Sequence, residues 1–449
     1  MVGVSLSRWT MSYFAAALVA LLVAEFLMTI GYGFPAAAQA APETLILVHI
    51  VAIGWLSLLM CGALLQFVPV LVVQPLHSDR LALPALGSLI AGLAALIIGF
   101  LQLAGHVDRD IPAFALAGVL LGSGFALVVW NLGRTVVAAQ TIPLASRFVV
   151  AGLACMAATA GLGIIFALVF GGTVTYRPLA VLTGAGLPVH VVAGLGGWLS
   201  FTAMGVSYRL LAMFMLAPEL EGRTTKGCLY LGVAALVLAI GGGVLTILFD
   251  QDPEFVLLAA AAVGLMALML YGGDVLHLYR ARKRRHIELN SRMAALALAS
   301  LAASVALIIV LLPLGRLTDH IGAVVFLIAF GWLSGLGLAQ LYKIVAFLTW
   351  LECYGPVLGK APTPRVQDLV TEARALKWFV LYFLAVWTGT IALLASAALV
   401  FQITAAAMLI ASGGIVAELV RTRRLADVKA VSRLPLGVQR PRLLLSYHA

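Results

Sequence analysis

Charge is the scarcest property of this chain of 449 residues. Asp, Glu, Lys and Arg make up 10% of the residues, whereas soluble globular domains carry about 25%. Hydrophobic residues make up 63%, and the mean hydropathy is +1.10. This composition excludes an ordinary soluble domain and indicates an integral membrane protein whose main neighbour is membrane lipid.

Cysteine is also scarce. The four residues Cys61, Cys155, Cys228 and Cys353 are scattered and never form a CxxC spacing. We interpret them as small apolar residues that imply neither a disulfide framework nor a cysteine-based metal site. The sequence also lacks a nucleotide-binding glycine loop and a Ser/His/Asp nucleophile pattern.

Long apolar runs are abundant, and about 20 such residues suffice to cross a bilayer. Because the runs are continuous rather than alternating, they predict helices and not barrel strands. The first run is too long for a signal-peptide core. The predicted fold is an all-α membrane protein with twelve spans, at about 11–33, 45–73, 81–104, 111–132, 147–172, 186–216, 227–249, 255–279, 292–314, 318–350, 376–397 and 400–420.

Basic residues are unevenly distributed between the two sets of loops. With the N-terminus in the cytoplasm, only three of the 28 Lys and Arg residues are outside, namely Arg109, Arg177 and Arg316. Cytoplasmic loops of membrane proteins carry the excess of Lys and Arg. The sequence therefore predicts a bacterial-type inner-membrane protein with both termini and a basic tail, 426–449, in the cytoplasm. The net charge of +10 then needs no nucleic-acid partner to explain it.

The motif Gly-Trp-Leu-Ser occurs three times, in the second, sixth and tenth spans, at 54–57, 197–200 and 331–334. A second set marks the fourth, eighth and twelfth spans: NLGR at 131–134, HLYR at 277–280 and ELVR at 418–421. Both sets of motifs recur every four spans, and this common period predicts an internal repeat. We expect one membrane domain, 1–449, built as a pseudo-threefold ring of three four-helix units at about 1–140, 141–287 and 288–425. An ordinary twelve-helix transporter with recurring small-residue contacts is the alternative.

Three of the eight histidines lie within the first turns of the repeated spans, on the predicted outer side: His49, His190 and His320. A histidine is costly to bury in lipid unless it has a partner. Neutral imidazole is a good ligand for iron, copper or zinc. A heme between helices would use two of these histidines and fill an apolar pocket. Hydrogen bonds to neighbouring helices are the alternative.

The histidines precede the tryptophans of their motifs by different spacings: His49 by six residues, His190 by eight and His320 by twelve. At about 100° per α-helical residue, His190 and His320 point the same way and His49 nearly the opposite way. In a threefold ring, His49 and His320 then face one pore and His190 faces the next. The six-residue difference in spacing, about 9 Å of rise, argues against this pair.

Twelve helices, threefold repetition and histidines at the outer ends of spans 2, 6 and 10 resemble subunit I of the heme-copper oxidases and nitric oxide reductases. In that family the second helix supplies a low-spin heme ligand, which His49 matches, and the sixth supplies a copper ligand, which His190 matches. The tenth carries His-x-His for the high-spin and low-spin hemes. Here that motif reads Thr318-Asp319-His320, so only the low-spin ligand is kept. The seventh span lacks the family's histidine pair.

The resemblance therefore implies one bis-histidine heme b, on His49 and His320, without the full oxygen-reducing centre. It implies electron transfer, or the handling of nitric oxide or another small gas, and a redox partner protein. The NnrS-like group, associated with heme, copper and nitric oxide stress, is a looser analogy. Copper at His190 and the oligomeric state stay open. A transporter with an outward-facing histidine site for a metal or solute is the alternative function.

Glu25 lies inside the first span, and a carboxylate within the membrane is a functional hypothesis by default. We expect it to accept a hydrogen bond from a heme-ligating histidine, to carry protons, or to join two helices structurally. The motif tryptophans, Trp55, Trp198 and Trp332, are predicted to be packing residues, with contact to a porphyrin face as the alternative.

Overall fold

The structure is a computed structural model that describes residues 8–108 and 111–445. Within these ranges the chain forms helices and no strand, and twelve helices are long and apolar enough to cross a membrane. This confirms the predicted all-α, twelve-span membrane protein. Arg109 and the last four residues of the predicted tail, 446–449, lie outside the described residues.

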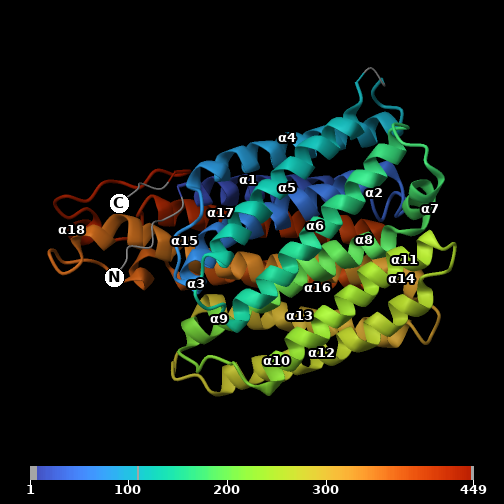
Figure 1. The fold of residues 1–449 in the computed structure, drawn as a ribbon. Coiled ribbons are helices and arrows are strands. Elements are labelled where there is room, and N and C mark those ends of the chain that lie inside the picture. Colours follow the sequence, from blue (N-terminus) through green and yellow to red (C-terminus); the bar gives the residue numbers. More distant parts are fainter. Residues whose placement is uncertain (1–7, 109–110, 446–449) are drawn as a thin grey trace. The chain divides into compact units, whose positions relative to one another are not determined.

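The chain divides into two compact units. Figure 1 labels the helices of both and colours them along the sequence. Unit 1 consists of Met1–Gln66 and Glu288–Ala449, and unit 2 consists of Phe67–Ile287. The pseudo-threefold ring of three repeat units stays a prediction.

Unit 1 combines the first and last parts of the chain. Its helical segments are α1 (Thr10–Thr29), α2 (Pro42–His49), η1 (Ile50–Ser57), the first part of α3 (Leu58–Val72), α13 (Leu289–Leu311), α14 (Leu317–Phe326), η5 (Leu327–Ser334), α15 (Gly335–Tyr354), η6 (Gly355–Val357), η7 (Val366–Leu369), α16 (Glu372–Leu394), α17 (Ala398–Arg423) and α18 (Ala430–Arg433). α1 packs against η1 and α17, and α14 and η5 pack against α16.

Unit 2 is continuous in sequence. After the end of α3 it contains η2 (Asp79–Leu81), α4 (Ala82–Leu103), α5 (Ala113–Val137), α6 (Leu144–Phe170), α7 (Arg177–Ala185), α8 (Leu187–Val191), η3 (Val192–Phe201), α9 (Thr202–Met215), α10 (Arg223–Val237), η4 (Leu238–Gly242), α11 (Gly243–Leu248) and α12 (Glu254–Arg280).

Two local features differ from the predicted spans. α16 ends at Leu394 and α17 begins at Ala398, with Ser396 between them in the left-handed region at φ 53°. This single left-handed residue separates the two helices at a boundary, predicted between 397 and 400, that almost no polar residue marks. The short helix α7 was not predicted; a proline in its first turn, Pro178, is compatible with a helix start.

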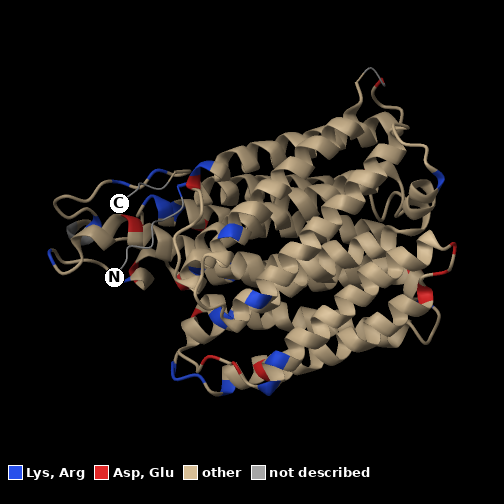
Figure 2. Ribbon diagram, in the orientation of Figure 1, with Lys and Arg blue, Asp and Glu red and all other residues tan. Residues whose placement is uncertain are grey.

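Both described chain ends lie at the same end of unit 1, where the Ser12 hydroxyl donates to the Leu444 carbonyl over 2.7 Å. An even number of membrane crossings places both ends on one side. Figure 2 shows charged residues mainly toward the ends of the helices, while the middle parts visible in this view carry almost none. This distribution is the one that a lipid-embedded bundle requires, because charge is costly at the bilayer centre.

Candidate functional site

Each Gly-Trp-Leu-Ser motif lies in a π-helical segment: η1, η3 and η5 respectively. A π-helix pairs each N–H with the carbonyl five residues back, is rare, and occurs frequently at functional sites. The sequence motif therefore coincides three times with an uncommon backbone conformation.

The serine that ends the motif stabilises this conformation in unit 1. Ser57 Oγ donates to the Ala52 carbonyl, and Ser334 Oγ donates to the Ala329 carbonyl, both over 2.7 Å. Each acceptor is five residues back, whereas serine in an α-helix bonds the carbonyl three or four residues back. The hydroxyl thus satisfies a carbonyl in the widened turn.

The two π-helical segments of unit 1 are joined by side chains. Trp55 Nε1 donates to Ser334 Oγ over 2.7 Å, and both residues are fully buried. η5 also accepts a bond from α16, since the Tyr382 hydroxyl donates to the Phe330 carbonyl over 2.9 Å. The helix that carries His49 is therefore tied to the helix that carries His320. Trp55 therefore forms a hydrogen bond in addition to the predicted packing. Trp198 and Trp332 are buried, which is consistent with the predicted packing role.

His49 ends α2, directly before η1, and its side chain is half-buried. Its Nδ1 lies 2.7 Å from the Leu45 carbonyl oxygen. Because a carbonyl only accepts, this bond assigns the proton to Nδ1 and leaves a lone pair on Nε2. Metal-ligating histidines commonly have this arrangement, with the second nitrogen fixed by a carbonyl. His49 therefore has the chemistry that an iron ligand would need, with Nε2 as the ligating atom.

His320 lies in the first turn of α14 and is also half-buried. Because the Trp55–Ser334 bond joins the two helices, it allows the positions of His320 and His49 along them to be compared. His49 precedes Trp55 by six residues and His320 precedes Ser334 by fourteen. The difference of eight residues corresponds to at most about 12 Å of rise, because 1.5 Å per residue applies only to the α-helical part of the interval. His320 therefore lies farther from the bond, toward the N-terminal end of α14. His320 fits a heme ligand by its chemistry and its unit, and this offset in depth still argues against the pair.

The predicted directions of the three histidines are not valid in the structure, because they require an α-helix of 3.6 residues per turn between each histidine and its tryptophan. Much of that interval is π-helical, with hydrogen bonds to the fifth residue back, so each residue turns by less than 100°. The pairing of His49 with His320 therefore depends on their common unit and on the Trp55–Ser334 bond.

His190 lies in unit 2, on α8, two residues before η3. Its ring centroid is 5.4 Å from that of Phe166 on α6, with the planes at 52°. Gly163 permits this packing, because a Cβ there would lie 3.3 Å from His190 Cε1. The structure thus places His190 on a different unit from His49 and His320. Thr318, at the position of the missing high-spin ligand, is exposed.

Glu25 is fully buried in α1. Its Oε1 accepts a hydrogen bond from Ser412 Oγ of α17 over 2.8 Å. Its Oε2 has no hydrogen-bond partner among the described residues. Of the predicted roles, a bond between two helices is therefore present, and the second oxygen keeps a further role open.

Sequence reasoning missed several polar residues that the structure brings together. Single hydroxyls in apolar runs, such as Tyr382 and Ser412, carry no signal in composition; only Ser334 recurs in a motif. In unit 2, buried Asp274 accepts bonds from Thr224, Tyr208 and Thr225 over 2.7, 3.0 and 2.9 Å. These bonds join α9, α10 and α12, and all the carboxylate's partners are neutral hydroxyls.

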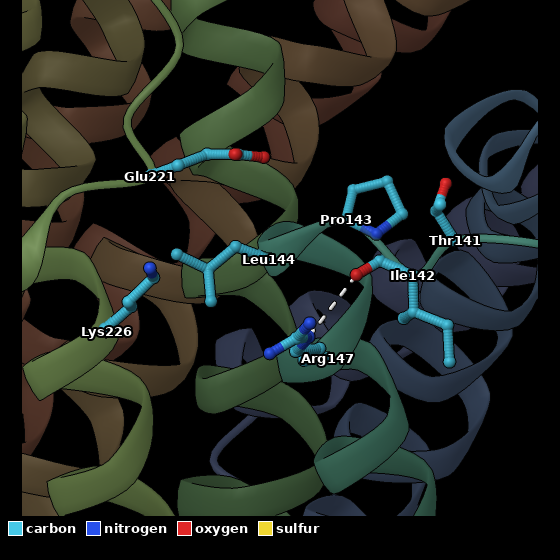
Figure 3. Close-up of a pocket in the computed structure, with 7 residues that line it drawn as sticks. All are labelled: Thr141, Ile142, Pro143, Leu144, Arg147, Glu221 and Lys226. Carbon is cyan, nitrogen blue, oxygen red and sulfur yellow. Dashed lines mark hydrogen bonds between the residues drawn. The ribbon is translucent and has the colours of Figure 1, made fainter.

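A cavity of about 380 Å³ opens in unit 2 where α6 and α10 begin. Figure 3 shows Lys226, Leu144 and Arg147 along it, and Arg147 Nε donates to the Ile142 carbonyl over 3.3 Å. Arg147, Lys226 and Glu221 are all exposed. Exposed charges at helix ends are typical of a membrane surface, so we assign no ligand to this cavity.

Within residues 8–108 and 111–445, no three or more His, Cys, Asp or Glu side chains are grouped to hold a metal ion. That finding concerns groups of three or more side chains, so it does not test a heme that two histidines hold. Neither the protein-family models nor the curated proteins compared with this chain give a match.

Proposed function

We propose that this chain is a heme-binding integral membrane protein of the heme-copper oxidase subunit I type, with a single heme b on His49 and His320. The observation that carries the proposal is the bond between His49 Nδ1 and the Leu45 carbonyl, which leaves Nε2 as the ligating atom. Further support comes from the common unit of the two histidines, whose helices are neighbours at the Trp55–Ser334 bond. The eight-residue offset counted from that bond argues against His320, and the variant His320→Ala tests it directly.

In this proposal each group of the chain has a defined task. Leu45 fixes the tautomer of His49 and makes its ring more basic. The heme supplies one-electron transfer, or the handling of nitric oxide or another small gas. Oxygen reduction is not included, because Thr318 stands where the family has its high-spin heme ligand. His190 belongs to the other unit and would hold at most a copper ion.

We also propose that the protein lies in a bacterial-type inner membrane with both termini in the cytoplasm. The support is the excess of Lys and Arg on the side of the chain ends, together with the contact between Ser12 and Leu444.

The test is a reduced-minus-oxidised absorption spectrum, with metal analysis, of the full chain purified from membranes. We expect one iron per chain and the sharp reduced bands of a bis-histidine heme b. The variants His49→Ala and His320→Ala should lose these bands. His190→Ala is the matched control, because it removes a half-buried histidine of the other unit, and it should keep them.

Elution on a sizing column and a thermal melt establish that each variant is folded. Folded wild-type protein without heme bands rejects the proposal. Bands that survive His320→Ala but not His49→Ala reject His320 as the second ligand. Bound zinc or copper without iron favours the transporter with a histidine metal site.

A further inference from the structure

A second polar site lies at the centre of unit 1. Glu25 meets Ser412 close to the midpoint of α17, and Tyr382 lies close to the midpoint of α16. Tyr382 bonds η5, whose Ser334 bonds Trp55. Five helical elements of one unit thus bring together a carboxyl from the last third of α1 and hydroxyls that include those at the middle of α16 and α17.

The polar atoms around Glu25 are already engaged. Ser412 donates to Glu25 Oε1, Tyr382 donates to the Phe330 carbonyl, and Ser334 both donates to Ala329 and accepts from Trp55. Oε2 of Glu25 is the buried oxygen of this cluster that lacks a partner among the described residues. The site therefore offers one open position, on a carboxyl oxygen.

The charged groups near Glu25 do not neutralise it. α1 packs against η1 and α17. η1 contains no titratable side chain, and Glu418, Arg421 and Arg423 of α17 lie near its inner end. Glu418 pairs with Arg374, and Tyr382 is the titratable group that α16 adds beside Glu25. Among the described residues, no Lys or Arg forms an ion pair with Glu25.

Two observations on the described residues determine which ligand fits: one oxygen of Glu25 is open, and no Lys or Arg pairs with the carboxyl. A metal cation needs several oxygen ligands, as calcium and magnesium show, and here a single oxygen is open. An isolated carboxylate in an apolar interior is very costly, and the group neutralises by binding a proton instead. The smallest cation, a proton, is the one that a single open oxygen can hold.

We propose that Glu25 is a proton-binding site buried among the helices of unit 1. An O–H bond forms on Oε2 when the proton binds and breaks when it leaves, and the carboxyl changes between neutral and singly negative. Ser412 positions the group through Oε1 in both forms. The site does not require heme, so it stands or falls independently of the proposed function.

Infrared spectroscopy of the full chain in lipid nanodiscs tests this site. A protonated carboxyl has its own C=O stretching band, separate from the bands of carboxylate. We expect such a band at neutral pH, shifted in D2O and lost at high pH. Glu25→Gln should remove it, and Ser412→Ala should move it to higher frequency, because that variant removes a hydrogen bond to the carbonyl oxygen. Asp274→Asn is the matched control, which deletes another buried carboxyl and should leave the band unchanged.

If Glu25→Gln does not fold, Glu25→Asp replaces it and should shift the band. The proposal is overturned if the band is missing from wild type, if it survives Glu25→Gln in folded protein, or if Asp274→Asn removes it. Heme content, measured on the same samples, is expected to be equal in Glu25→Gln and wild type. If folded Glu25→Gln loses its heme but keeps the infrared band, the proton site at Glu25 is refuted and the heme proposal still stands.

Discussion

At the scale of single residues, the chain pairs the charges at the C-terminal end of α17 in unit 1. Arg374 contacts Glu418 over 2.6 Å and Asp427 over 2.5 Å, and Arg421 contacts Asp427 over 2.7 Å. Burial raises the pKa of Asp427, but the hydrogen bonds and charges of Arg374 and Arg421 outweigh it and hold the pKa below its ordinary value. The folded state therefore favours ionised Asp427.

Asp427→Asn should consequently lower the melting temperature at neutral pH. The stabilisation by Asp427 is fully present above its unfolded pKa of about 3.9 and is lost as the pH falls through the lowered folded pKa. The difference between variant and wild type should thus shrink at acidic pH, as thermal melts in detergent at several pH values would record. Exposed Asp252, changed to Asn, serves as the control and should have little effect. A difference that grows on acidification would contradict the assignment.

At the scale of elements, α16 and α17 pack closely because of one glycine. A Cβ at Gly414 would overlap the Trp378 ring, whereas a Cβ at the neighbouring Gly413 would meet open space. Both glycines lie in the same helix, so only the contact with α16 distinguishes them. Small residues of this kind let membrane helices approach each other.

Gly414→Ala should therefore destabilise the fold by about 1–3 kcal/mol, because the helices must separate or Trp378 must move. Gly413→Ala is the matched variant, and it should be neutral or stabilising by up to about 1 kcal/mol, since alanine favours the helix. Denaturant titration followed by tryptophan fluorescence measures both. Equal effects of the two variants would show that packing against Trp378 is not what limits this position.

At the scale of the whole molecule, the proposed orientation can be tested with introduced thiols. The four native cysteines are buried and free, so background labelling should be low. Asp252 and His286 are both exposed, in loops that adjoin opposite ends of α12. With the termini in the cytoplasm, Asp252 is outside and His286 is inside.

Asp252→Cys should react with a membrane-impermeant maleimide in intact cells, because its loop faces outward. His286→Cys should react only after the membrane is permeabilised. Mass-tag shifts on a gel report the labelling. The reverse pattern would invert the proposed topology, and labelling of both sites in intact cells would contradict a membrane-spanning α12.

The amino-acid sequence by itself determined the fold class, the number of spans and most of their positions. The reason is physical: lipid admits only helices whose apolar length matches the bilayer, so composition along the chain is sufficient. It also singled out His49, Glu25 and the three repeated motifs, because polar groups and uncommon patterns stand out in an apolar chain. His320 as the partner of His49 is still a prediction.

Only the tertiary structure decided how these residues are held. The π-helical turns have the same apolar composition as α-helix, so no pattern predicted them, and they invalidated the angular argument for the histidines. The bonds Trp55–Ser334 and Glu25–Ser412 join residues 279 and 387 positions apart. In the sequence alone, a hydroxyl in an apolar run has many equivalent candidate partners. Only the packing of the helices selects one of them.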